Sequence, residues 1–341
     1  MSLQTKSLLV TEELERFYSE KFYFSYSSIN KLLFSPRLFY SHYILNQKED
    51  SVDAHLIAGR ATHCLLLQPE EFDNEFIMLP GKLPTDSNRP IIDHIFNTHY
   101  LPMGNDTLEL EDFPNELIGQ LLVVNLYQNL KTDAQRLDKI LSDNNKEYFS
   151  FLKKKQNKSV IDVGVKQQAE SVVEAIRADE RITALMQLNP VKDDKVTVHN
   201  ELFLKMDLKE YDFGFKGFVD NVVIDENTKT IFINDLKLTG KLIQDFPDSV
   251  RYYRYDIQAS MYMTLCYKHF INDRPDASEW KVIFTFITVD KYNQIYPFQV
   301  SDETLTMWET DFYGVVTKVD YHYRHRNYGL PYELAIGNVK L

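Results

Sequence analysis

An aspartate and a lysine stand two positions apart at the end of an apolar, β-branched run, in the segment IFINDLKLTGK (residues 231–241). Such a run is typical of a buried strand. Because side chains alternate across a strand, we expect Asp235 and Lys237 on one face and Leu236 on the other. An acid beside a base can serve catalysis, although most such pairs are solvated ion pairs that contribute little. The same tripeptide recurs at residues 207–209, so the spacing alone does not identify a site.

A second acid, Asp220, lies in the preceding predicted strand, GFKGFVDNVV, in phase with Phe218 and Val222. Strict alternation would place its carboxylate on the same face as these two apolar side chains. A lone aspartate in a strand is usually a turn or edge residue. If the hairpin turns at residues 227–228, however, Asp220 comes close to register with Asp235 on the next strand.

Two facing carboxylates repel each other unless a cation joins them. Hard divalent ions prefer oxygen ligands, and a nearby lysine can orient water or stabilise charge that develops on a phosphoryl oxygen. Asp220, Asp235 and Lys237 would therefore suffice for phosphodiester hydrolysis.

Polar residues on the predicted helix after these strands could join the same site. In RYDIQASMYM, Gln258 and Tyr262 are four residues apart and share one helical face. Arg254 precedes Gln258 by one turn and Arg251 by two turns. The alternative is a partly buried polar pair, which helices commonly carry at this spacing.

A histidine lies in the apolar helix AGRATHCLLL, where a core histidine is the commoner outcome. Gly59 precedes His63 by one turn on the same face. A glycine inside a helix costs about 1 kcal/mol unless a close approach requires it, so this pair makes His63 a candidate for the site.

The elements that must position these residues follow from hydrophobic periodicity. Serine at position 27 or 28 is expected to cap a first helix, and Ser35 followed by Pro36 a second. A third helix runs to about Pro69. The remaining expectations, in chain order, are a long connection at 80–115, a basic loop at 153–159, helical periodicity at 162–187, an antiparallel meander of three strands at 197–237, a long helix at 250–270, strands at 280–290 and 292–300, and a closing helix at 302–322.

This order predicts one α/β domain over residues 1–341, with a mixed central sheet flanked by helices. We expect the N-terminal helices with the histidine in residues 1–79. A partly helical insertion would occupy residues 80–190, and the catalytic strands and helices residues 191–341.

As a set, these motifs resemble the PD-(D/E)XK nuclease superfamily, and within it the RecB-like and RecE-like exonucleases. The resemblance rests on GFVD, then DLK at the end of the next strand, then Q-x-x-x-Y on the next helix, with an upstream helical histidine. The segment FSYSSINKLLFSPRLFY is similar to the Ser-x-Ser…Cys-Pro-Arg entry segment of RecB-like nucleases. The segment AGRATHCLLLQPEEF is similar to a Gly…His…Leu-x-Pro-x-x-Phe stretch of RecE-like phage proteins. The likeness covers residues 24–76 and about 160–265, and it implies a restriction-endonuclease-like core.

The resemblance also implies roles for single residues. A Mg²⁺ or Mn²⁺ ion would be bound by His63, Asp220, Asp235 and the carbonyl of Leu236. Lys237 would be catalytic, while Gln258 and Tyr262 would position DNA or the lysine. Relatives with an iron-sulfur cluster have cysteine before the proline, whereas this chain has Ser35 and no C-terminal cysteine group, so we expect no iron-sulfur cluster.

Composition limits where DNA can bind. The formal net charge is -12 over 341 residues, which argues against a general nucleic-acid coat protein. DNA would instead follow the few basic residues near the strand ends, and we expect contacts from Arg37, Arg60, Lys241, Arg251 and Arg254. The alternative for Arg251 and Arg254 is local pairing with Asp245, Asp248 or Asp256.

Two cysteines, Cys64 and Cys266, lie in apolar periodic stretches and are expected in the core rather than in disulfides. No run of about 18 apolar residues is present, and the N-terminal segment mixes acids into its apolar residues, so we expect a cytoplasmic protein without a membrane span.

The sequence thus favours a metal-dependent DNA exonuclease. If the RecE-like resemblance applies, the substrate is a duplex end in a phage or prophage recombination system, and the partner is a single-strand annealing protein. Whether the protein forms a homo-oligomer is left open. Rival readings are a single-strand-specific or nicking nuclease, and a nuclease-derived DNA-binding subunit without catalysis.

Overall fold

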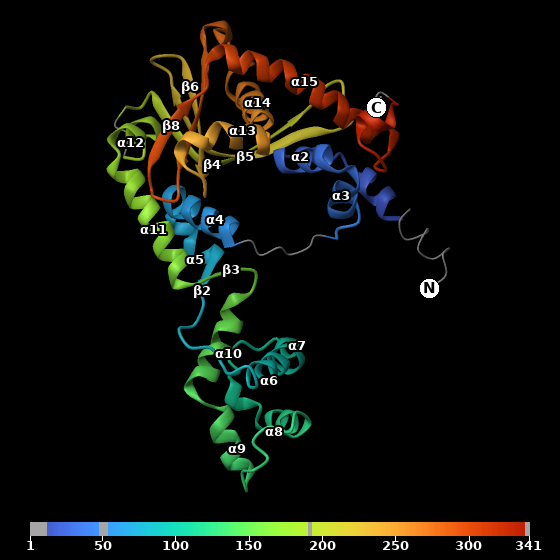
Figure 1. Ribbon diagram of the computed structural model, residues 1–341, viewed down its shortest axis with the longest axis vertical. Helices are drawn as coiled ribbons and strands as arrows, with labels where there is room; N and C mark the ends of the chain where they lie inside the picture. The colour runs from blue at the N-terminus through green and yellow to red at the C-terminus, as the bar shows by residue number, and fades with distance from the viewer. Residues whose placement is uncertain (1–11, 48–53, 190–192, 338–341) are drawn as a thin grey trace. The chain divides into compact units, whose positions relative to one another are not determined.

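The computed structural model describes residues 12–47, 54–189 and 193–337. Residues 1–11, which carry much of the expectation about the N-terminal segment, lie outside this part. The chain divides into two compact units (Figure 1). One combines the chain up to Gln68 with the chain from Glu170 onward, and the other comprises Pro69–Ala169. This second unit has different bounds from the expected insertion at 80–190.

The first unit contains a mixed six-stranded sheet in which β5 is central to the site. Its order is β4-β5-β6-β7-β8, with β1 joining β5 on the side of β6. The β4, β5 and β6 strands form the predicted antiparallel meander, β7 runs parallel to β6, and β8 returns antiparallel. The strands are β1 Tyr23–Phe24, β4 Val196–Asp207, β5 Gly214–Asp225, β6 Thr230–Leu238, β7 Lys281–Val289 and β8 Ile295–Gln299.

Helices cover both faces of this sheet. In Figure 1, α14 and α15 lie on one face, and α4, α11 and α12 lie on the other. The helices are α2 Tyr26–Phe34, α3 Pro36–Phe39, α4 Ala54–Leu67, α11 Val163–Ala178, α12 Glu180–Met186, α13 Phe246–Tyr253, α14 Tyr255–Cys266, α15 Asp302–His325 and α16 Tyr332–Ala335. Short 3-10 or π turns are η1 Tyr40–Ile44, η5 Ile243–Asp245, η6 Tyr267–Ile271 and η7 Ala277–Glu279. The prediction of a mixed sheet flanked by helices is confirmed.

Side-chain alternation along the strands feeds two apolar cores. On β6, Ile231 and Ile233 enter the core shared with α14 and α15, while Leu236 enters the core shared with α4, α11 and α12. On β7, Phe286 enters the core on the α14 side and Ile287 enters the core on the α4 side. The sheet is therefore buried on both faces, which explains why its inner strands read as nearly continuous apolar runs.

The hairpin between β5 and β6 has the predicted register, and it opens at the candidate site. Asp225 pairs with Thr230 and the ladder continues to Asn221 opposite Asn234, where it ends. At its other end, β5 pairs with β1 only at Gly214 and Phe215. The edge of β5 that faces β6 is thus open between these two ladders, and Asp220 lies in this fork.

Several helical predictions need correction. The first helix is capped by Ser25 rather than by serine 27 or 28, while the Ser35–Pro36 start of α3 is confirmed. The predicted helix at 250–270 is broken at Arg254, which has a left-handed backbone (φ 58°) between α13 and α14. Gly59 has open space around the position of a Cβ atom, so no close approach explains it.

The second unit is mostly helical and has its own core, which includes Ile92, Phe113 and Phe149. The predicted long connection at 80–115 is wrong, because it contains helices that bury apolar side chains. The predicted basic loop at 153–159 begins inside a helix, and Lys153 pairs with Glu109 at 2.6 Å. The helices and strands of the second unit are α5 Phe72–Glu75, β2 Phe76–Met78, α6 Arg89–Ile95, α7 Leu101–Met103, α8 Pro114–Val123, α9 Asp133–Ile140, α10 Asp143–Lys155 and β3 Ser159–Ile161. Its short turns are η2 Pro69–Glu71, η3 Phe96–Tyr100 and η4 Leu110–Asp112.

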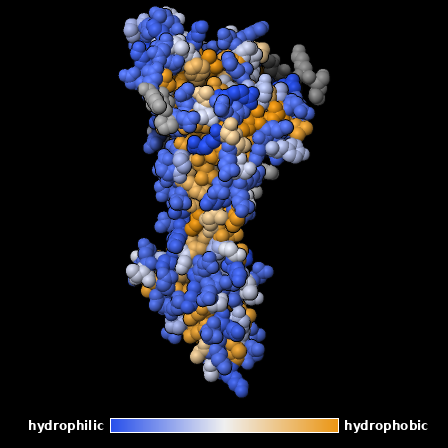
Figure 2. All heavy atoms as spheres, turned by 90° about the vertical axis from the view of Figure 1, so that its left-hand side faces the viewer, coloured by the Kyte–Doolittle hydropathy of each residue, from blue (hydrophilic) through white to orange (hydrophobic). Residues whose placement is uncertain are grey.

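The surface is mostly polar. Figure 2 shows apolar side chains gathered in patches among hydrophilic ones on the face that it displays. Among the described residues, no helix has both the length and the apolar character that a membrane crossing requires.

Candidate functional site

The fork between β5 and β6 gathers the predicted acids and the lysine. Because the β-ladder ends at Asn221, the side chain of Asp220 takes over the hydrogen bonding of the next strand: its Oδ2 accepts from the backbone N–H of Leu236 at 2.7 Å. Asp220 is buried, with 7% of its surface exposed. The backbone of β6 thereby fixes one carboxylate beside the strand that carries the other.

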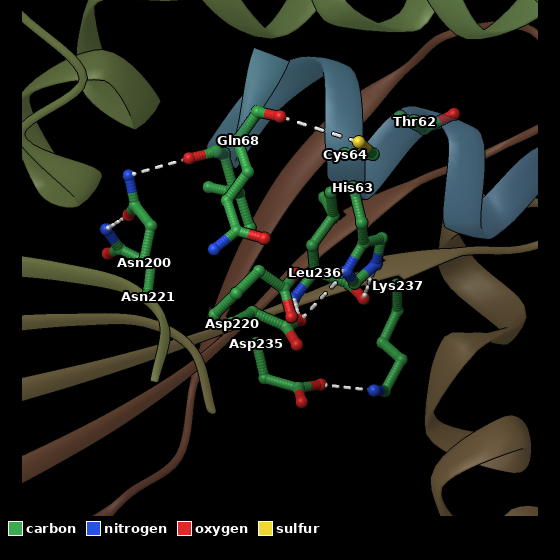
Figure 3. Close-up of polar contacts among 12 residues, drawn as sticks. Thr62, His63, Cys64, Gln68, Asn200, Asp220, Asn221, Asp235, Leu236 and Lys237 are labelled. Carbon is green, nitrogen blue, oxygen red and sulfur yellow. Dashed lines mark hydrogen bonds and ion pairs between the residues drawn. The ribbon is translucent and has the colours of Figure 1, made fainter. Parts of the chain in front are cut away.

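Helix α4 contributes His63 to this fork. Figure 3 shows its ring extending from α4 toward Asp220 and Leu236. The Nε2 atom lies 3.2 Å from the carbonyl oxygen of Leu236, and Nδ1 lies 3.7 Å from Asp220 Oδ2. The structure therefore brings together three of the four predicted ligands, His63, Asp220 and the Leu236 carbonyl.

Asp235 and Lys237 lie on the α14 side of β6, on one face as alternation predicts. Lys237 Nζ lies 2.5 Å from Asp235 Oδ2 and 4.9 Å from the centre of the Tyr255 ring. The Asp235 carboxylate is completely buried, and its Oδ1 accepts from Gln258 Nε2 at 3.0 Å. Gln258 also donates to the Tyr262 hydroxyl at 3.2 Å, so both predicted helix residues support Asp235.

Glu201 is a site residue that the sequence reading missed. Its Oε1 lies 3.4 Å from His63 Nδ1, and ligand atoms of His63, Glu201 and Asp220 all lie within 4.8 Å of one another. Glu201 and Asp220 are equally far from the turn between β4 and β5, so the same hairpin reasoning that paired Asp220 with Asp235 could have found it.

The backbone at Glu201 explains why its side chain and that of Asp220 meet. Glu201 has a left-handed conformation (φ 46°), and the ladder has no pair between Asn200–Asn221 and Leu202–Val219. Val219 and Val222 are three residues apart and would point to opposite faces of a regular strand, yet both enter the same core. Side-chain alternation is therefore interrupted between them. The expectation that Asp220 shares a face with both Phe218 and Val222 is therefore wrong, because this local irregularity breaks strict alternation.

Electrostatics at the fork are unbalanced toward negative charge. Burial raises the pKa of Asp235 to about 6 against the opposing effect of Lys237, and burial likewise raises the pKa of Asp220. Burial lowers the pKa of His63, but the carboxylates of Asp220 and Glu201 overcome this and raise it to about 9. Burial also lowers the pKa of Lys237, yet Asp235 and Asp220 raise it above its usual value.

The donor set fits a hard divalent cation. The carboxylates of Glu201 and Asp220 and the imidazole of His63 lie within reach of one ion, with the Leu236 carbonyl beside the imidazole and the Asp235 carboxylate nearby, which suits Mg²⁺ or, with the imidazole, Mn²⁺. With His63 neutral, as a ligand must be, three carboxylates face one lysine, and a divalent charge would balance them.

A ladder of three asparagines holds α4 and α12 against the sheet at this point. Asn234 Nδ2 donates to Asn221 Oδ1 at 2.7 Å, and Asn221 Nδ2 donates to Asn200 Oδ1 at 2.8 Å. Each member of the ladder also reaches a helical carbonyl: Asn200 donates to Leu67 of α4, while Asn221 and Asn234 donate to Met186 and Leu185 of α12. Figure 3 shows Asn200 and Asn221 beside the end of α4. The ladder thus positions the helix that carries His63.

The basic residues that were expected to contact DNA do not gather around Gln258. Because the helix is broken at Arg254, Arg251 and Arg254 do not continue the face of α14. Arg251 pairs with Asp248, and Arg254 pairs with Asp256 at 3.0 Å. This agrees with the alternative that both arginines pair with nearby aspartates. Arg37 donates to the Gly329 carbonyl, while Arg60 and Lys241 are exposed. Both cysteines are buried, and neither forms a disulfide.

Comparisons with known proteins add little to this geometry. No family model and no curated protein matches the chain. Among solved structures, a presumed exonuclease from Eubacterium rectale is similar, with a TM-score of 0.45 and 12% sequence identity over 100% of this chain and 88% of that chain. A likeness of this degree does not assign a function, so the proposal below depends on the residues of the site.

Proposed function

We propose that this protein is a metal-dependent nuclease that hydrolyses phosphodiester bonds of DNA. The observation that carries the proposal is the convergence of His63, Glu201 and Asp220 within 4.8 Å, at a strand fork that also holds the Asp235–Lys237 pair. Neither half is informative alone, since acidic clusters and ion pairs are common. Together they support a site in which candidate cation ligands lie near a mostly buried ammonium group, an arrangement suited to phosphoryl transfer.

The residues divide the chemistry. His63, Glu201, Asp220 and the Leu236 carbonyl would hold the ion, with Asp235 next to them. A bound Mg²⁺ or Mn²⁺ would neutralise phosphate charge and make water a better nucleophile at neutral pH. Attack of water on phosphorus breaks one P–O ester bond, and Lys237 can donate a hydrogen bond to the phosphoryl oxygen on which charge increases.

Supporting residues keep the lysine in place. Asp235 holds Lys237 by its Oδ2, Gln258 holds Asp235 by its Oδ1, and Tyr255 lies under the ammonium group. A cation held between a carboxylate and an aromatic ring remains charged, consistent with the raised pKa of Lys237. This arrangement supports charge stabilisation by Lys237 rather than proton abstraction.

Exonuclease action at a duplex end, a role in phage recombination and an annealing partner are finer proposals that rest on the motif resemblance. They are tested with linear and covalently closed circular DNA in Mg²⁺ or Mn²⁺, with labels at either end of the linear form. We expect the linear DNA to be lost and the circle to survive. Cleavage of the circle would favour an endonuclease. No cleavage with either metal would contradict the enzyme proposal and favour a DNA-binding subunit.

A further inference from the structure

A row of aromatic and basic side chains begins directly beside the candidate site on the β4–β5 hairpin. Phe203 pairs with Phe218 across the two strands, and Lys205 pairs with Lys216 one step further. These four residues are called the β4–β5 stripe below. They follow Glu201 and Asp220 at intervals of two residues, which is about 7 Å along a strand for each step.

The β4–β5 stripe lies on the face of the sheet from which His63 enters the site. Leu204 and Val219 enter the core on the α14 side, and a Cβ atom on Gly217 would meet the Tyr262 ring at 2.8 Å. Phe203 and Phe218 alternate with these residues and therefore point to the opposite side. That is the side from which His63 reaches Asp220.

The two phenylalanines are unusually open for residues in the middle of long strands. Phe203 is 48% exposed and Phe218 is 56% exposed, and their ring centres are 5.0 Å apart at an angle of 45°. Neighbouring positions on the other face, such as Val219, are fully buried. The stripe therefore offers two adjacent aromatic surfaces to a partner molecule, next to the carboxylates.

The charges of the β4–β5 stripe indicate which class of molecule it would bind. Among the residues that the structure describes, neither Lys205 nor Lys216 forms a salt bridge: Lys205 Nζ lies 3.7 Å from the centre of the Tyr23 ring and acts on Asp207 only at longer range. Asp207, the next acid along β4, is already held by Lys21 and Tyr23. On a chain of net charge -12, this local pair of lysines outside any salt bridge favours a polyanion over a protein surface.

We propose that the β4–β5 stripe binds a single-stranded segment of nucleic acid that leads into the site. Unpaired bases stack on Phe203 and Phe218, and the phosphates beyond them contact Lys205 and Lys216. A duplex keeps its bases stacked inside, so this stripe recognises a strand that is unpaired or opened. The inference deepens the proposed function, because it names the form of substrate that the same site receives.

Binding of a short fluorescein-labelled oligothymidylate, followed by anisotropy in a chelator to prevent cleavage, tests the aromatic pair. Phe203→Ala and Phe218→Ala should each weaken binding by about 5-fold or more, because stacking on a base is lost. Phe218→Trp should retain affinity and Phe218→Leu should lose it. Phe34→Ala, at an exposed phenylalanine of α2, is the control and should bind as the wild type does. Equal binding by the Leu and Trp variants would overturn the stacking role.

The lysines are tested by the dependence of affinity on salt. Lys205→Gln and Lys216→Gln should each reduce the slope of log affinity against log salt by about 0.7, as expected for one phosphate contact on a single strand. Lys209→Gln, on the turn between β4 and β5, should leave the slope unchanged. Unchanged slopes in all three variants would mean that phosphates run elsewhere.

Binding and cleavage separate this inference from the proposed function. If the wild type binds oligothymidylate through the stripe but no metal supports hydrolysis, the stripe stands and the nuclease proposal is wrong. If the wild type cleaves DNA while the phenylalanine variants bind and cleave single strands normally, the nuclease proposal stands and the stripe is wrong. Failure of the wild type to bind oligothymidylate at low salt would also overturn the stripe.

Discussion

Lys237 and Lys209 follow the same dipeptide, Asp-Leu, but differ in their surroundings. Lys237 is 15% exposed and contacts a carboxylate with no exposed surface, whereas Asp207 is 65% exposed and pairs with Lys21. Lys237→Ala should therefore abolish hydrolysis while metal and DNA binding remain, because the ammonium group acts on the transition state. Lys209→Ala should have little effect. Initial rates and DNA affinities of both variants check this, and equal losses would remove the case for Lys237.

The metal requirement tests His63 and Glu201 as ligands. His63→Ala and Glu201→Ala should each raise the metal concentration needed for activity, and Mn²⁺ should rescue the histidine variant better than Mg²⁺, since it accepts a wider range of ligand sets. Activity measured against metal concentration, beside the thermal midpoint, separates this from a core role. A lower midpoint with an unchanged metal requirement would make either residue structural.

The pKa of His63 predicts how stability changes with pH in the metal-free protein. It is about 9 in the fold, above the ordinary value of 6.5, so its charge stabilises the fold fully below pH 6.5 and this contribution disappears as pH rises toward 9. We expect a loss on the order of 1–3 kcal/mol over that interval. Denaturant unfolding at both pH values in a chelator measures it.

Two variants isolate this pH effect. His63→Gln should remove the loss between pH 6.5 and 9. Glu201→Gln should shift the loss to lower pH, because one of the carboxylates that raise the pKa of His63 is gone. A wild-type slope in the His63→Gln variant would assign the titration to another group.

At the scale of elements, alternation and turn position were enough to predict strands β4 to β8 and the register of the β5–β6 hairpin. Asn221 opposite Asn234 follows from a turn at residues 227–228, whereas the end of the ladder at this pair, which opens the fork, was not predicted. What could not be predicted depends on single backbone conformations. Glu201 and Arg254 have left-handed backbones, yet no glycine or proline marks either position in the sequence. At Glu201 this conformation lets its side chain meet that of Asp220, and at Arg254 it breaks a helix.

The asparagine ladder was also missed, because an isolated asparagine in a strand reads only as a weak strand former. Its meaning depends on Asn200, Asn221 and Asn234 being in register on three strands, which requires both hairpins at once. Buried amides that satisfy one another specify how α4 and α12 dock.

Asn221→Leu should destabilise the protein by roughly 1–3 kcal/mol, because it removes the donor to Asn200 Oδ1 and to the Met186 carbonyl, and one of the two acceptors of Asn234 Nδ2. It should also raise the metal requirement through α4, although Asn221 touches no ligand atom in the described contacts. Urea unfolding and metal titration check the two effects, with Asn272→Leu at an exposed turn as control. A stability loss without any change in metal requirement would mean that the ladder does not position His63.

At the scale of the whole molecule, the acidic composition directed attention to local basic residues but did not indicate which ones. Sequence reasoning chose Arg251 and Arg254 on the assumption of one continuous helix, and the structure pairs both with nearby acids. The lysines of the β4–β5 stripe became visible only when the strands placed Lys205 opposite Lys216. The net charge of the chain therefore limits which partners can bind, while strand register determines which basic residues lie side by side.

The two units each have an apolar core, which makes a prediction for unfolding. Phe149 is fully buried in the core of residues 69–169, and Phe284 is fully buried beside the sheet of the first unit. Replacing either by alanine should cost roughly 3–5 kcal/mol. We expect calorimetry to resolve two transitions, with Phe149→Ala lowering one and Phe284→Ala the other, because each cavity weakens only its own core. Phe34→Ala, at an exposed position, should lower neither. A single transition lowered by both core variants would mean that the two units unfold together.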